Sequence, residues 1–158
     1  MVEFVRTPHG GRLLLDDAES DLIRRMAGEL KALLTGLDTA DDPVIERLFP
    51  ATYEDAAEEA SYQALIGEDL VQQKLEALEV VSTSLGPDGS EVDLEGEKLH
   101  TWLACLTDLR LAIGTRLEVD EEAMEADIDA SDPRGRSLAV LHWLGWIQEG
   151  ILRTCAGH

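Results

Sequence analysis

The chain has 158 residues and carries 33 Asp and Glu against 13 Lys and Arg, so its formal net charge is −20. This length suits one domain, since hydrophobic cores usually divide only above about 250 residues. The charge argues against direct binding of DNA or RNA and against an anionic membrane surface, because these polyanions need a cationic protein face. Hydrophobic residues make up 44% of the chain, which is enough for a core. We therefore expect a single folded domain over residues 1–158.

The first fifteen residues are predicted to form a small β-hairpin. Two β-compatible runs, 1–5 and 12–15, flank Thr7-Pro8-His9-Gly10-Gly11, which is typical of a turn. The N-terminus lacks the apolar stretch of a signal peptide, and no run reaches the roughly 20 apolar residues of a membrane span. We expect a cytoplasmic protein with no membrane contact, whose two cysteines are reduced.

Residues 16–158 are predicted to form a bundle of five to six helices, which makes the protein mainly α. A 3.6-residue apolar stripe follows Asp16 and Asp17, one of which caps the first helix, and Gly36 ends it. The pair Asp42-Pro43 begins a short helix that stops before Pro50. Two further helices are expected over 54–65 and 68–85, with Gly67 between them.

The C-terminal half is predicted to contain the centre of the bundle. Residues 86–90 are predicted to form a loop. Asp93 is expected to cap a helix that runs from Leu94 to about Leu117. The last helix is expected over 133–154. Both of these helices are apolar around nearly their whole circumference, which is typical of buried helices. They also leave room for a helix-mediated homodimer.

An acidic segment separates these two helices. Its eight carboxylates stand without a Lys or Arg, at Glu118, Asp120, Glu121, Glu122, Glu125, Asp127, Asp129 and Asp132. Hard cations such as Ca²⁺ and Mg²⁺ bind carboxylate oxygens, but the segment lacks the residue spacing of a Ca²⁺-binding loop and the glycine at its turn. The four histidines of the chain do not have the spacing of metal ligands either. We predict no metal site and no cofactor. The segment suits a basic partner, so Glu121, Glu122 and Glu125 are candidate partner-binding residues.

Two arginines and two tryptophans on the last two helices are further candidates. Arg110 and Arg116 lie in an apolar helix, where each either forms ion pairs with carboxylates of neighbouring helices or lines a groove that binds a carboxylate or an acidic partner. Trp143 and Trp146 are three residues apart and can share a helix face. That face either packs into the core or forms an aromatic hot spot for a partner.

Cys105 and Cys155 are the two thiols of the chain and its candidate redox residues. If the last two helices pack antiparallel about residue 126, Cys105 faces residue ~147, roughly 12 Å along the axis from Cys155. A disulfide needs Cα atoms within about 7 Å. No Lys, Arg or His lies within four residues of Cys105 to lower the pKa of its thiol. We interpret both as buried free thiols.

Three segments carry a resemblance to a known family. They are Asp42–Pro50, Thr107–Leu117 and His142–Glu149, in this order and spacing. Together they resemble an actinobacterial family defined by a domain of unknown function, some of whose members are AosR-type oxidative-stress regulators of transcription. The resemblance implies a cytoplasmic partner of a stress sigma factor that controls cysteine-supply genes. Regulator-type members are associated with a C-x-x-x-C pair, which this chain lacks, so no redox switch is carried over.

The leading hypothesis is a non-enzymatic interaction module. It would be a transcription-associated stress regulator that works through a protein partner such as a sigma factor or RNA polymerase. A thiol redox sensor using Cys105 and Cys155 is the second hypothesis. The third is a divalent-metal-dependent protein or enzyme, which only the abundance of carboxylates favours.

Overall fold

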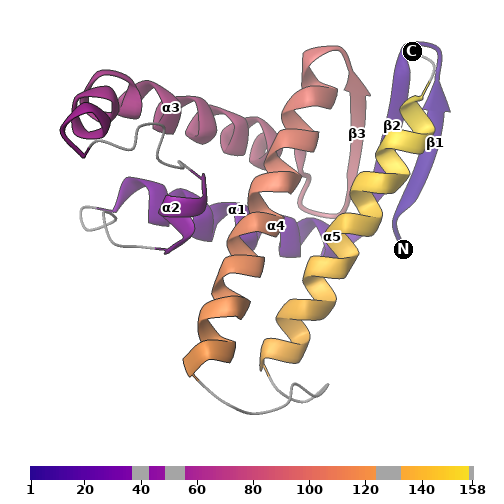
Figure 1. Cartoon of the computed structure of the whole chain (residues 1–158). Coiled ribbons are helices and arrows are strands. Elements are labelled where there is room, and N and C mark those ends of the chain that lie inside the picture. Colours follow the sequence, from indigo (N-terminus) through magenta and orange to yellow (C-terminus); the bar gives the residue numbers. More distant parts are fainter. Residues whose placement is uncertain (37–42, 49–55, 124–132, 157–158) are drawn as a thin grey trace.

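The computed structural model describes residues 1–36, 43–48, 56–123 and 133–156, and these residues form a mainly α fold (Figure 1). Their elements, in chain order, are β1 (Glu3–Thr7), β2 (Gly10–Leu15), α1 (Asp17–Thr35), α2 (Pro43–Leu48), α3 (Ala56–Ser84), β3 (Ser90–Glu95), α4 (Glu97–Ala123) and α5 (Pro133–Cys155). The predicted mainly α class with a small N-terminal hairpin is confirmed. The structure differs from the prediction in three respects: it has a third strand, two predicted helices are one, and the helix expected from Leu94 to about Leu117 runs from Glu97 to Ala123.

The three strands form one antiparallel sheet in the order β1-β2-β3. The predicted hairpin is present, with Thr7 opposite Gly10 and Phe4 opposite Leu13. The strand β3 corrects the expectation that Asp93 caps a helix, because Asp93 lies within this strand and its carboxylate accepts a 2.7 Å hydrogen bond from Arg12 Nε. Ser90, Val92 and Leu94 are buried while the residues between them are exposed, which is the two-residue period of a strand. A third strand also supports a hairpin that would be marginal alone.

The helix α1 begins where the sequence predicts, at a capping box on Asp16. The Asp16 carboxylate accepts a 2.9 Å hydrogen bond from the Glu19 backbone, and the Glu19 side chain accepts one of 2.9 Å from the Asp16 backbone. The helix ends at its C-cap residue, Gly36, as predicted. The short helix α2 is likewise confirmed, although its predicted cap, Asp42, lies outside the described residues.

The predicted break at Gly67 is wrong, because α3 runs without interruption from Ala56 to Ser84. A glycine inside a helix costs only about 1 kcal/mol relative to alanine, so one glycine is a weak stop signal in a helix of this length. The two helices expected over 54–65 and 68–85 are therefore one, and the described part of the chain contains five helices.

The helix α4 lies at the centre of the molecule (Figure 1). It contacts α5 in antiparallel orientation on one side and α1, α2 and α3 on the other, while α5 also covers β1 and β2. The core runs through all of these elements, and its largest fully buried side chains include Leu13, Ile23, Trp102, Leu106, Leu109, Leu144, Ile147 and Ile151. The two apolar helices are thus placed side by side, as their composition predicts.

Candidate partner-binding site

A buried glutamine joins α4 to α5. Gln148 Nε2 donates hydrogen bonds to the Leu103 carbonyl at 2.9 Å and to Thr107 Oγ1 at 2.6 Å, and Gln148 Oε1 accepts one from Arg110 Nη1 at 2.7 Å. These contacts give the two helices the antiparallel register predicted from the sequence. They also show that the contact of Arg110 across this interface is an amide rather than the expected carboxylate.

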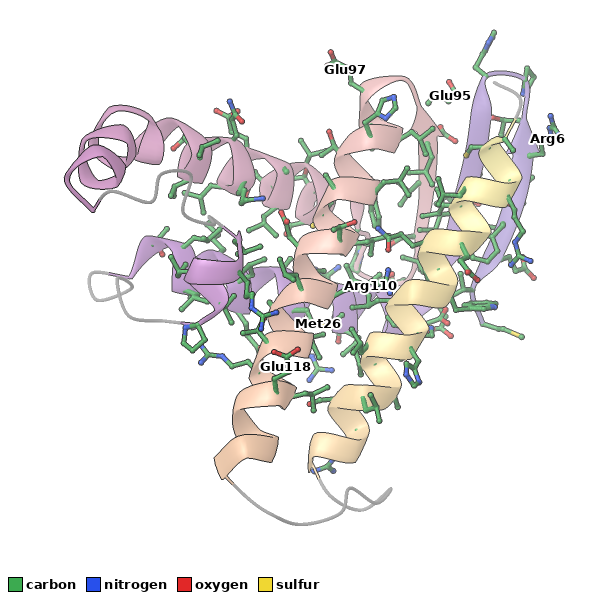
Figure 2. The ribbon with its side chains drawn as sticks, viewed as in Figure 1. Arg6, Met26, Glu95, Glu97, Arg110 and Glu118 are labelled. Carbon is green, nitrogen blue, oxygen red and sulfur yellow. The ribbon has the colours of Figure 1, made fainter. Side chains whose placement is uncertain are left out.

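Arg110 remains on the surface despite this bond. It lines a groove of about 310 Å³ on the side of α4 that faces α2 and the middle of α5. The Arg47–Glu118 ion pair, at 2.7 Å, lies at the same groove and joins α2 to α4. Figure 2 shows Arg110 and Glu118 along the same helix. The two arginines of this groove thus have carboxylate and amide partners, and these contacts join α2, α4 and α5.

Arg116 lies at a different hollow from Arg110. It lines a cavity of about 580 Å³ between α1, α2, α4 and the N-terminal turns of α5. Arg116 is exposed and also has an interaction within the chain. The structure therefore does not bring the two candidate arginines into one site.

The two candidate tryptophans differ in exposure. Trp143 is half-buried and packs against the core, whereas Trp146 is 42% exposed. The ring of Trp146 meets the ring of Phe4 edge to face, with 5.4 Å between centroids and an interplanar angle of 67°. Phe4 belongs to β1, one of the two edge strands of the sheet, and was not identified from the sequence. Its distance from Trp146 along the chain leaves no local signal for the pair.

A glycine explains how the Phe4 ring approaches α5. Gly150 lies one helical turn after Trp146, and a Cβ atom at this position would overlap the Phe4 ring. Around Trp146 the exposed face of α5 carries His142, Glu149 and Arg153. The result is an exposed aromatic side chain held by a second ring and surrounded by polar groups. We name Phe4, Trp146 and these three polar residues the aromatic surface.

The acidic candidates lie at the end of the described region. Glu121 and Glu122 belong to the last turns of α4, but the structure does not describe their side chains. Glu125 lies outside the described residues. Their proposed contact with a basic partner stays a prediction.

Both thiols are free and buried, as the sequence analysis expects. Burial and, to a lesser extent, the negative charge of Asp108 raise the pKa of Cys105 to about 12, while Lys74 opposes this shift. Lys74 and Asp108 themselves form an ion pair at 3.0 Å. Cys155 packs against Gly11 of β2, and burial also raises the pKa of its thiol. Raised pKa values leave little thiolate at neutral pH, which does not favour reactive cysteines.

Within the described ranges, no group of three or more His, Cys, Asp and Glu side chains is placed to hold a metal ion. No helix in this part of the chain is long and apolar enough to cross a membrane.

The fold and the aromatic surface define a mainly α protein with a candidate contact site for another macromolecule. Comparison with known families places the chain more specifically. Residues 1–155 match the model of a domain of unknown function, DUF2017, and the chain belongs to this family. The family resemblance inferred from the three sequence segments is therefore confirmed.

The relatives found are mycobacterial. Proteins named oxidative stress regulator AosR from Mycobacterium tuberculosis and Mycobacterium bovis are each 25% identical over 159 residues, which cover 91% of this chain and 72% of the relative. A relative from Mycobacterium leprae is 31% identical over 125 residues, which cover 78% of this chain and 56% of the relative. No solved structure matches the chain.

Proposed function

We propose that the protein is a cytoplasmic regulator of the response to oxidative stress, that it acts by binding a protein partner, and that it catalyses no reaction. The observation that carries this proposal is the similarity, over 91% of the chain, to proteins named oxidative stress regulator. The partner we propose is a sigma factor or another subunit of RNA polymerase, as the family resemblance implies.

The net charge of −20 supports regulation through a partner. A protein that binds DNA directly gains most of its affinity by releasing counterions from phosphates, and an acidic surface forgoes this gain. A basic protein partner would be attracted by the same charge and would supply the contact with DNA. The protein would then influence transcription without touching a promoter.

The aromatic surface supplies the anchor for such a partner. Tryptophan is enriched among interface residues that carry most of the binding free energy, and such residues are surrounded by contacts that exclude water. Phe4 already orders the ring of Trp146, which lowers the entropy lost when a partner binds. His142, Glu149 and Arg153 would form the polar rim around it.

The test is a binding assay with purified sigma factor and RNA polymerase core. The full chain and its Trp146→Ala variant are titrated against each, and we expect the substitution to weaken binding at least roughly thirtyfold, as at other tryptophan anchors. Leu152→Ala is the matched control, because Leu152 is a 56% exposed apolar residue on α5 outside the aromatic surface. It should leave the affinity unchanged.

Two results would overturn the proposal in different ways. Equal affinities of the wild type and the Trp146→Ala variant would remove the aromatic surface from the account. Retention of the isolated protein on promoter DNA at physiological salt, without a partner, would contradict regulation through a protein.

A further inference from the structure

The crossing of α1 with α4 leaves an unfilled cavity next to the core. In Figure 1, α1 passes behind α4 instead of lying along it. Beyond the point of contact the two helices diverge, and the space between them is the cavity of about 580 Å³ that Arg116 lines. We propose that this cavity binds a small amphipathic carboxylate, of the class of medium-chain fatty acids, with its chain on the apolar walls and its carboxylate on Arg116.

The size and the walls of the cavity fit an apolar chain. Ligand sites of proteins typically enclose about 300–1,000 Å³ and are lined mostly by apolar side chains with a few polar groups. The apolar walls come from three helices, with Met26, Leu30 and Leu33 from α1, Val44 from α2, and Leu109 and Ile113 from α4. Figure 2 shows Met26 beside α4, at this crossing.

The polar groups of the cavity select a carboxylate and orient it. Among the residues that the structure describes, the polar lining of the cavity consists of Arg116, Glu29 and Ser137. A guanidinium carries five N–H donors in a planar fork, and two of them can bind a ligand carboxylate through parallel hydrogen bonds. Glu29 repels a ligand carboxylate, which leaves Arg116 as the end of the cavity that accepts the head group.

The second hollow beside α4 is a weaker candidate for the same ligand. Its volume is about 310 Å³, Arg110 is bonded to Gln148, and Arg47 is paired with Glu118 at 2.7 Å. A carboxylate there would have to displace contacts that join α2, α4 and α5. The inference about the larger cavity is independent of the proposed protein partner, because the aromatic surface contributes none of its lining residues.

The test is calorimetric titration of the full chain with three ligands that share one chain and differ in the head group. These are decanoate, decanol and decylamine, each kept below its micelle concentration. We expect decanoate to bind at least tenfold more tightly than the other two. Arg116→Gln should weaken decanoate roughly ten- to hundredfold and leave decanol unchanged, because only the charged hydrogen bonds are removed. The matched control Arg25→Gln, an exposed arginine of α1 that does not line the cavity, should bind like the wild type.

A variant that fills the cavity separates specific binding from adsorption to the surface. Ile113→Trp should abolish binding of all three ligands, and Ala112→Phe, from a half-buried lining position, replaces it if the first variant does not fold. Absence of decanoate binding to the wild type would overturn the inference. Undiminished binding of decanoate by Arg116→Gln or by the folded filled variant would also overturn it, as would tighter binding of decylamine, which would assign the head group to Glu29.

Discussion

The two sides of α4 are packed in different ways. Toward α5, Leu106, Leu144 and Ile147 are completely buried, and the polar Gln148 finds three hydrogen-bond partners. Toward α1, Ile113 and Ala112 are half-buried beside a cavity of about 580 Å³. Antiparallel helices keep their ridges and grooves in contact along their length, whereas crossing helices meet over a short stretch. The helix α4 thus packs closely against α5 around Gln148, whereas it borders the larger cavity on the side of α1.

The largest expected difference between the two sides is in the free energy of unfolding that is lost when a side chain is truncated. Ile147→Ala removes a completely buried side chain of α5, and we expect it to lower the free energy of unfolding by about 2–5 kcal/mol. Ile113→Ala removes half-buried atoms that border the cavity and should cost about 1 kcal/mol, because the lost contacts are fewer. Urea denaturation of both variants measures the difference. Equal losses would contradict the contrast in packing.

Added volume should distinguish the cavity from the packed contact between α5 and β1, with a smaller effect. Gly150→Leu drives a side chain into the Phe4 ring, and overpacking of this kind typically costs about 1–3 kcal/mol. Ala112→Leu extends into the cavity and should change the free energy of unfolding by less than about 0.5 kcal/mol. Thermal unfolding of the pair provides the measurement, and a destabilised Ala112→Leu variant would show that the cavity is not available.

The buried amide between α4 and α5 is expected to contribute about 1–3 kcal/mol. Gln148→Leu keeps the bulk of the side chain but leaves Arg110 and Thr107 without their partner across the interface. Ser137→Ala is the control at the cavity, where a polar group faces open space. In chemical denaturation, Gln148→Leu should have a clearly lower free energy of unfolding than Ser137→Ala. Indistinguishable curves would show that the amide does not stabilise the contact between α4 and α5.

Thiol chemistry distinguishes a fully buried position of α4 from a position at the cavity without changing stability much. Cys105 is buried on α4, and its raised pKa should keep it unreactive toward Ellman's reagent at pH 8 until the protein unfolds. A thiol introduced by Ile113→Cys borders the cavity and should react far faster. Rapid oxidation of native Cys105 and Cys155 by mild peroxide, followed by mass spectrometry, would instead favour the redox-sensor hypothesis.

The Cys105 thiol makes the free energy of unfolding depend on pH. Its pKa rises from 9.0 to about 12 in the folded state, so the folded protein binds more protons than the unfolded chain between these values. The free energy of unfolding is therefore maintained below about pH 9 and falls as the pH rises toward 12. A Cys105→Ala variant should show a shallower fall than the wild type in denaturation curves, and identical slopes would contradict the shift.

The elements that local sequence determines were predicted well. The capping box at Asp16, the turn between β1 and β2, and Pro43 at the start of α2 all act through neighbours in the chain. The strand β3 was missed because Asp93 resembles a helix cap, while its true partner, Arg12, becomes a neighbour only when the sheet forms. The helix break predicted at Gly67 was wrong for a different reason, because a single glycine is too weak a signal to end a long helix.

The candidate site was predicted in part. Trp146 was identified from residue type and spacing, but its neighbour Phe4 reaches it only through the packing of β1 against α5. The antiparallel register of α4 and α5 followed from helix length, whereas the pairing of Arg110 with Gln148 depends on side-chain position within that register. The cavity beside Arg116 follows from the way α1 crosses α4, which periodicity along one helix does not specify.

Hydrogen–deuterium exchange on the complex with a sigma factor or RNA polymerase core tests the central claim most directly. If the protein regulates through a partner at the aromatic surface, backbone exchange should slow in the peptides that cover Glu3–Thr7 and His142–Arg153. Exchange around Val80, a 39% exposed apolar residue of α3, should stay unchanged. A bound complex with protection confined to regions outside the aromatic surface would contradict the account.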